Sequence, residues 1–131
     1  VPVWSHILKA CGIFPINRGQ KDFKSIYHAV KVVEEKNNLV IFPEGTRKAR
    51  KKNVKAKIGA VYVAIAADAD IIPVYIEEGK RYPFKKIRVV HGTPYSLSEY
   101  KEQIKDKKLL NELTTELMNK IYSLGDKIDA K

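Results

Sequence analysis

Strand-like and helix-like segments alternate along this chain and predict an α/β fold, a mixed sheet flanked by helices. Short apolar runs such as 39–42 and 71–76 have the length and composition of strands. The segments between them repeat apolar residues at helical spacing. This alternation is typical of helices packed on the faces of a sheet. At 131 residues, we expect one domain over residues 1–131.

The apolar spacing predicts each element in turn. Helices are expected at 2–11, 22–35 and 58–67, and strands at 13–16, 39–42, 71–76 and 86–91. A turn is expected at 78–80. Helix 58–67 is apolar nearly all round, so we expect it to be buried on several sides. A final helix of about 18 residues, with leucine and isoleucine recurring from Leu109 to Leu124, is expected to pack on the sheet. The less favoured role for it is binding a partner or a membrane surface.

Composition limits the class of protein. The apolar content of 44% is ordinary for a globular domain. No apolar stretch reaches the roughly 18 residues of a membrane-spanning helix. The one cysteine, Cys11, excludes an internal disulfide, and its apolar surroundings predict a buried thiol. No group of residues has metal-ligand spacing, so we expect no metal site.

The net charge of +10 is concentrated in one loop. Six basic residues follow Arg47 within ten positions: Lys48, Arg50, Lys51, Lys52, Lys55 and Lys57. A solvated loop is the plainest interpretation, and attraction to anionic headgroups or to a phosphorylated acyl donor is the functional one. The loop contains no aromatic residue that could stack on bases, so nucleic acid is not an expected partner.

The hexapeptide Phe42-Pro43-Glu44-Gly45-Thr46-Arg47 directly follows one apolar run and is the most informative motif. Pro43 should end the strand, and polar groups at the carboxyl end of a strand lie where open α/β sheets place ligands. Gly45 permits a sharp turn or a close approach to a ligand. The fork of donors on Arg47 suits a phosphate or carboxylate. Alone, the motif would be a β-turn in which Glu44 pairs with Arg47.

Two further runs identify a family. Upstream lies Gly12-Ile13-Phe14-Pro15-Ile16-Asn17-Arg18, and downstream lies Ile71-Ile72-Pro73-Val74-Tyr75-Ile76. With the hexapeptide between them, residues 1–95 resemble the glycerolipid acyltransferases of the 1-acylglycerol-3-phosphate acyltransferase type. Members of that family carry four ordered blocks: H-x4-D, G-x-x-F-x-x-R, F-P-E-G-T-R, and an apolar block around a proline. Residues 96–131 form a C-terminal helical segment beyond the resemblance.

The first block is absent. In the family its histidine is the general base, and its aspartate orients that histidine. Five positions after His6, His28 and His91 stand Cys11, Val33 and Ser96, none of them an aspartate. The chain also begins at Val1 without a methionine. We therefore expect an N-terminally truncated domain, without catalytic residues and inactive alone.

The resemblance implies roles for the remaining residues. The substrate-binding set, held to bind or shape the site of the acceptor phosphate, would be Arg18, Glu44, Gly45, Thr46 and Arg47. Lys57 is a weaker member, because a lysine at a helix start is favoured only beside an anion, and it is otherwise a plain loop lysine. Pro73 and Val74 would form an apolar wall for the acyl chain, or simply pack in the core. Lys48 replaces the serine that relatives often have after the third block.

The resemblance implies acyl transfer from acyl-CoA or acyl carrier protein to 1-acylglycerol 3-phosphate, in phospholipid biosynthesis. That chemistry needs no cofactor and no metal. The acceptor could instead be glycerol 3-phosphate or another lysolipid. The expected location is the cytoplasmic face of a membrane, peripheral or anchored through an upstream part. Two alternatives remain: a non-catalytic relative that binds phospholipid or phosphate, and a basic interaction module whose blocks match by chance.

Overall fold

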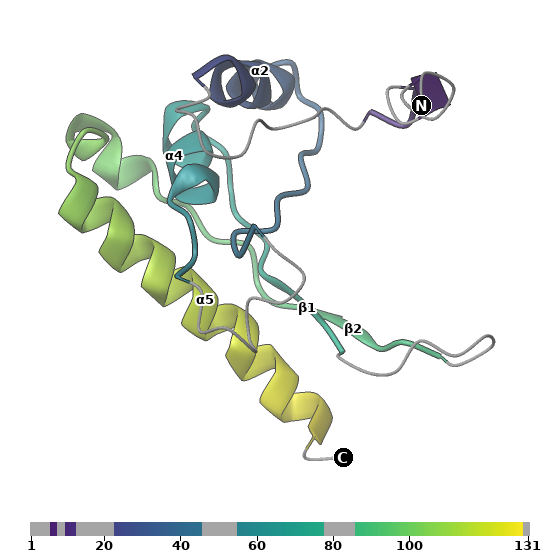
Figure 1. Ribbon diagram of the computed structural model, residues 1–131. Coiled ribbons are helices and arrows are strands. Elements are labelled where there is room, and N and C mark those ends of the chain that lie inside the picture. Colours follow the sequence, from purple (N-terminus) through teal and green to yellow (C-terminus); the bar gives the residue numbers. More distant parts are fainter. Residues whose placement is uncertain (1–5, 8–9, 13–22, 46–54, 78–85, 130–131) are drawn as a thin grey trace. The chain divides into compact units, whose positions relative to one another are not determined.

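The computed structural model describes residues 6–7, 10–12, 23–45, 55–77 and 86–129 (Figure 1). The chain divides into two compact units, Val1–Leu39 and Val40–Lys131, each described here by itself. The first contains α2 (Phe23–Glu34). The second contains α4 (Gly59–Ala66), β1 (Val74–Ile76), β2 (Val89–His91), the 3-10 helix η1 (Ser98–Gln103) and α5 (Lys107–Asp129).

In the first unit, α2 confirms the helix predicted at 22–35. It is followed by a turn in which Lys36 adopts a left-handed φ of 66°. The Lys36 amide donates to the Val33 carbonyl at 3.0 Å, and the Asn37 amide donates to the Val32 carbonyl at 3.2 Å. These two bonds satisfy carbonyls that the end of a helix would otherwise leave open.

The expected burial of Cys11 is wrong, because its thiol side chain is exposed. Residues 6, 7 and 10 are helical, and the Cys11 amide donates to the Ile7 carbonyl at 3.0 Å. The helix predicted at 2–11 is therefore confirmed where the structure describes it. Cys11 lies in the turn that ends this helix, next to Gly12 with its φ of 77°, and the turn leaves the thiol on the surface.

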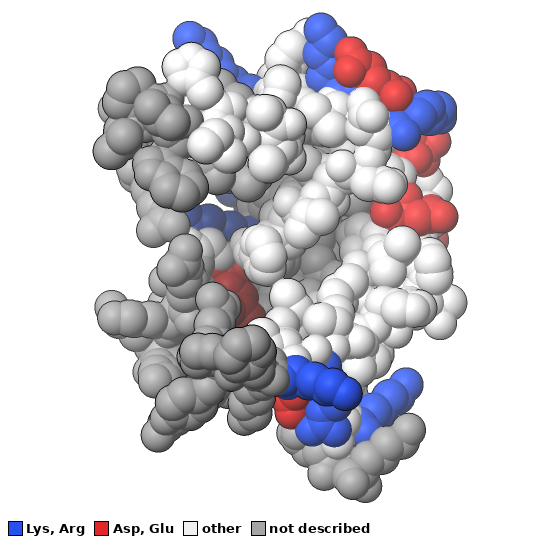
Figure 2. Space-filling model, turned by 90° about the vertical axis from the view of Figure 1, so that its right-hand side faces the viewer, with Lys and Arg blue, Asp and Glu red and all other residues white. Residues whose placement is uncertain are grey.

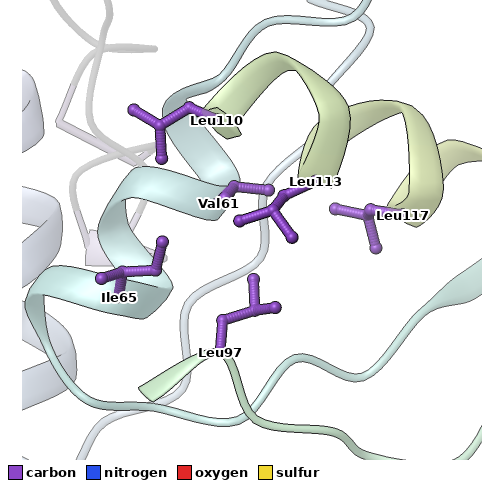
Figure 3. Packing of buried hydrophobic residues seen from close by; sticks show 6 residues of the cluster. All are labelled: Val61, Ile65, Leu97, Leu110, Leu113 and Leu117. Carbon is purple, nitrogen blue, oxygen red and sulfur yellow. The ribbon is translucent and has the colours of Figure 1, made fainter. Parts of the chain in front are cut away.

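The core of the second unit lies between α4 and the first half of α5 (Figure 3). Its buried cluster comprises Val61, Ile65, Leu97, Leu110, Leu113 and Leu117. Val61 and Ile65, on α4, are 0% and 1% exposed, as expected for a helix that is apolar nearly all round. The predicted helix at 58–67 and its burial are thus confirmed.

The final helix, α5, spans 23 residues and begins two residues before the first leucine of the predicted pattern. Asp106 explains the earlier start. Its carboxylate accepts the amides of Lys108 and Leu109 at 3.1 and 3.3 Å, so it satisfies donors at the helix start. Figure 1 shows α5 passing α4 and then the two strands, with which it makes contacts. Packing on the sheet, the favoured role for this helix, is confirmed.

The strands β1 and β2 pair antiparallel, with Tyr75 opposite Val90. They confirm parts of the strands predicted at 71–76 and 86–91. Ile71 extends the pairing through a bridge to Tyr95, and the Pro73 carbonyl accepts the Gly92 amide at 2.8 Å. Pro73 has no N–H to donate, so it fits this end of the strand as an acceptor only.

The strand expected at 39–42 does not form among the described residues. Val40 is 80% exposed and Phe42 is 69% exposed. A strand needs a hydrogen-bonded neighbour, and in the described part of the chain β1 pairs with β2 alone. The predicted mixed sheet therefore appears, within the described ranges, as two antiparallel strands combined with helices. The strand 13–16 and the turn 78–80 lie outside those ranges.

One face of the β1–β2 pair packs on α5 through Tyr75, whereas Val74, Ile76, Ile87 and Val89 are 42–58% exposed. Figure 2 shows a face of the molecule on which the described atoms are mostly uncharged, with groups of Lys, Arg, Asp and Glu atoms among them.

Among the described residues, no helix is both long and apolar enough to cross a bilayer.

Replacing Gly125 of α5 with alanine is expected to destabilise the protein. A Cβ at this position would lie 2.6 Å from Cζ of Tyr75, whose side chain is buried in a second cluster with Leu124 and Ile128. We expect a loss of about 1–3 kcal/mol in the free energy of unfolding, measured in urea, although alanine favours a helix. Gly59→Ala is the matched control, since a Cβ there meets no atom within 4 Å. Equal stability of the two variants would contradict this packing.

Candidate functional site

The hexapeptide begins as a tight turn, Phe42 to Gly45. The Gly45 amide donates to the Phe42 carbonyl at 3.0 Å, the hydrogen bond of a β-turn. Pro43 occupies the second position of the turn, for which its fixed φ is suited. Gly45 has a φ of 67°, where a side chain would be strained. The sequence prediction that glycine is needed for a sharp turn is therefore supported at Gly45.

Lys57 meets this turn from the start of α4. Its amide donates to the Pro43 carbonyl at 2.8 Å. Its side chain lies along Gly45, because a Cβ added to that glycine would lie 3.4 Å from Cε and 3.7 Å from Nζ of Lys57. The absence of a side chain at Gly45 therefore leaves the space that Lys57 uses, and the ammonium group lies beside the turn.

Glu44 is held from a different part of the chain. The Tyr122 hydroxyl, on α5, donates to Glu44 Oε1 at 2.7 Å. Both residues are half-buried. A hydrogen bond to a carboxylate is stronger than one between neutral groups, so it fixes the direction of the Glu44 side chain. The structure thus brings together a carboxylate, a glycine backbone, an ammonium group and a phenol.

Three of the predicted substrate-binding residues come together in this arrangement: Glu44, Gly45 and Lys57. The other three, Arg18, Thr46 and Arg47, lie outside the described residues. The pairing of Glu44 with Arg47 stays a prediction for the same reason. A cation beside a positive-φ turn can bind an anion such as a phosphate monoester.

Tyr122 is the residue that sequence reasoning missed. Packing on the sheet is the favoured prediction for the final helix, with partner or membrane-surface binding as the alternative. The helix also brings a hydroxyl to the motif. The interaction joins residues 78 positions apart, and no spacing rule within a helix or strand connects them. The available signal was one phenol on the apolar side of α5, near Ile121 and Leu124, where a buried hydroxyl needs a partner.

The two residues expected to line an acyl pocket, Pro73 and Val74, have different surroundings. Pro73 lines an open groove of about 620 Å³ between the strands and α5, together with Ile72, Leu124, His91, Lys120 and Lys127. Val74 is not among the groove's lining residues and is 42% exposed. An acyl-binding role for either residue stays a prediction.

A tyrosine and a lysine meet near this groove. The Lys120 Nζ lies 4.1 Å from the centre of the Tyr95 ring. Burial, together with the nearby Glu116 carboxylate, raises the pKa of Tyr95 to about 12. The phenol is therefore neutral at physiological pH, and its ring face attracts the lysine cation. In the described ranges, no three His, Cys, Asp or Glu side chains gather to hold a metal ion.

One upstream block departs from the family pattern in detail. Gly12 and Arg18 have the spacing of G-x-x-F-x-x-R, but Pro15 occupies the aromatic position and Phe14 lies one residue earlier. The hexapeptide, by contrast, matches at every position. The hexapeptide is therefore the stronger sequence evidence.

Comparisons with known proteins agree with these motifs. The family model described as Acyltransferase matches residues 1–77. A 1-acyl-sn-glycerol-3-phosphate acyltransferase of Bacillus subtilis (strain 168) is 30% identical over 127 residues, 93% of this chain. The chain spans 62% of the length of that relative. No solved structure matches the chain. The chain belongs to the acyltransferase family.

Proposed function

We propose that this chain binds the phosphate-bearing acceptor of a fatty acyl transfer. The reaction would move an acyl group from acyl-CoA or acyl carrier protein to 1-acyl-sn-glycerol 3-phosphate. One observation carries the proposal: in a member of the acyltransferase family, the F-P-E-G turn is folded with the Lys57 side chain against Gly45. The named activity of the Bacillus subtilis relative supports this choice of acceptor.

The proposed binding rests on charge and backbone geometry. Lys57 supplies an ammonium group beside the turn, and Arg47 follows that turn by two residues. A guanidinium can donate two parallel hydrogen bonds to phosphate oxygens, which orients the acceptor as well as binding it. Glycerol 3-phosphate or another lysolipid would present the same phosphate chemistry and is the alternative acceptor.

Proton removal from the acceptor hydroxyl is the step for which this chain has no assigned residue. Acyl transfer from a thioester needs a base for that proton, and the family's H-x4-D pair does not occur in the sequence. A relative that binds phospholipid or phosphate without catalysis is the second candidate function. In both cases we propose that the chain binds these amphiphilic molecules at a membrane surface.

Calorimetry with three soluble compounds, two short-chain lipids and glycerol 3-phosphate, tests the proposed acceptor. We expect 1-hexanoyl-glycerol 3-phosphate to bind, glycerol 3-phosphate to bind more weakly, and 1-hexanoylglycerol, which lacks the phosphate, not to bind detectably. Equal binding of the lipids with and without phosphate would refute a phosphate site. Binding of glycerol 3-phosphate as tight as that of the lysolipid would favour glycerol 3-phosphate as the acceptor.

The 131-residue chain alone is expected to release no CoA when given acyl-CoA and the lysolipid. The physical reason is the missing base: general base catalysis contributes about 10²–10⁴-fold to such transfers. The measurement is free thiol release, with a no-protein sample as control. Turnover above that control would show that another group in this chain takes the proton.

A further inference from the structure

The last turns of α5 pack closely against the strands β1 and β2. Gly125 lets the helix approach so closely that an added Cβ would lie 2.6 Å from the Tyr75 ring. Leu124 lies beside Gly92, where an added Cβ would lie 3.5 Å from its methyl groups. Tyr75, Leu124 and Ile128 form the second buried cluster. The position of Tyr122 is therefore set by the packing of the helix turns that follow it.

The fixed helix holds the motif turn through one hydrogen bond. Tyr122 packs against the second cluster, and its hydroxyl reaches Glu44 Oε1 at 2.7 Å. Glu44 directly precedes Gly45, against which the Lys57 side chain lies. A carboxylate beside an ammonium group competes with any anion for that cation. The direction of the Glu44 side chain therefore matters for anion binding at the turn.

We propose that Tyr122 is a positioning residue of the acceptor site, one that keeps the Glu44 carboxylate on α5 and the Lys57 cation available to phosphate. This role rests on the function proposed above. The phenol satisfies one oxygen of the carboxylate in a partly dry environment, where a charge-assisted bond is strong. Without the hydroxyl, Glu44 is free to turn toward Lys57 and to occupy the cation in place of the ligand.

Tyr122→Phe tests this role, because it removes the hydroxyl and retains the ring that packs in the cluster. We expect the dissociation constant of the 131-residue chain for 1-hexanoyl-glycerol 3-phosphate, measured by calorimetry, to rise about tenfold. Tyr100→Phe is the matched control: it removes the hydroxyl of another half-buried tyrosine, which packs against the first cluster, and should leave the affinity unchanged.

A second background separates positioning from a general loss of structure. In Glu44→Gln protein the side chain has no charge to compete for Lys57, so adding Tyr122→Phe should change the affinity less than about twofold. A tenfold loss in both backgrounds would overturn the proposal, since the hydroxyl would then act independently of the carboxylate. Thermal melts of the unaltered chain and of every variant identify any variant that fails to fold.

The outcomes also distinguish this role from the proposed function. If the unaltered chain binds the lysolipid and Tyr122→Phe binds it equally well, the positioning role is wrong and the acceptor site stands. If the unaltered chain binds no phosphate-bearing lipid, the acceptor site is wrong and the positioning role falls with it. A loss in Tyr122→Phe that Glu44→Gln abolishes supports both.

Discussion

Replacing Arg47 with alanine is expected to weaken binding of 1-hexanoyl-glycerol 3-phosphate by about 100-fold while leaving the thermal melt nearly unchanged. Arg47 is the guanidinium of the F-P-E-G-T-R motif, and the resemblance to glycerolipid acyltransferases assigns it to the acceptor phosphate. Removing one partner of a hydrogen-bonded charge pair costs about 2–5 kcal/mol, which corresponds to about 30-fold or more in affinity. The measurement is calorimetry on the purified chain.

Arg88→Ala is the control for the loss of one positive charge. Arg88 forms a forked pair with Glu77, with its NH2 nitrogen 2.7 Å from Oε1, and is not part of any family block. Its removal should change the lipid affinity less than about twofold, because exposed ion pairs contribute little. A drop of many degrees in the melt of Arg47→Ala would instead show that Arg47 holds the turn together through Glu44.

Leu117→Ala is expected to cause a large loss of stability. Leu117 is 2% exposed and lies in the cluster that joins α4 to α5. Truncating a buried leucine removes apolar contacts and leaves a cavity, at a cost of about 3 kcal/mol. Urea unfolding followed by circular dichroism measures the change, and the slope of the transition should stay the same.

Glu112→Ala supplies the surface comparison on the same helix. Glu112 is exposed, so its truncation should alter the free energy of unfolding by less than about 0.5 kcal/mol. If Leu117→Ala were as mild as Glu112→Ala, the α4–α5 cluster would not be the core of this unit. A loss confined to Leu117→Ala is the expected result.

Helices were the most predictable part of this fold. The repeated apolar positions of 58–67 and 109–124 reflect helices that are buried on several sides or on one face, and local spacing records that burial directly. The same spacing predicted the helix at 22–35, although Ala29 is its one buried residue and Phe23 and Tyr27 are both 71% exposed. The helix α5 begins two residues before the predicted pattern, because Asp106 caps its start by accepting hydrogen bonds from two backbone amides. An aspartate before an apolar run is a readable cap signal.

Strand 39–42 shows where local pattern stops being informative. Its four apolar residues have the composition of a buried strand, yet a strand exists only with a partner. Within the described ranges the β1–β2 pair provides the whole sheet, and Val40 and Phe42 face solvent. Pairing depends on segments distant in sequence, so composition alone could not decide it.

The candidate site divides in the same way. Gly45 and Lys57 were named from the motif and from a lysine at a helix start, and the turn brings their atoms together. Tyr122 was not foreseeable from spacing, since its bond to Glu44 depends on how α5 packs on the strands. Helix packing is set by side-chain contacts such as Gly125 against Tyr75.

Titrating the ¹⁵N-labelled chain with glycerol 3-phosphate, followed by amide chemical shifts, tests the central claim most directly. Binding at the motif turn predicts saturable shifts at Gly45 and Lys57, with smaller ones around Tyr122. A groove elsewhere on the described surface is lined by Lys55, Lys108 and Asn111 among others. The amide shifts of these residues serve as the reference for non-specific binding of phosphate. Shifts that gather at Lys108 and Asn111 and leave Gly45 unchanged would contradict the account, because phosphate would then bind surface lysines and not the family motif.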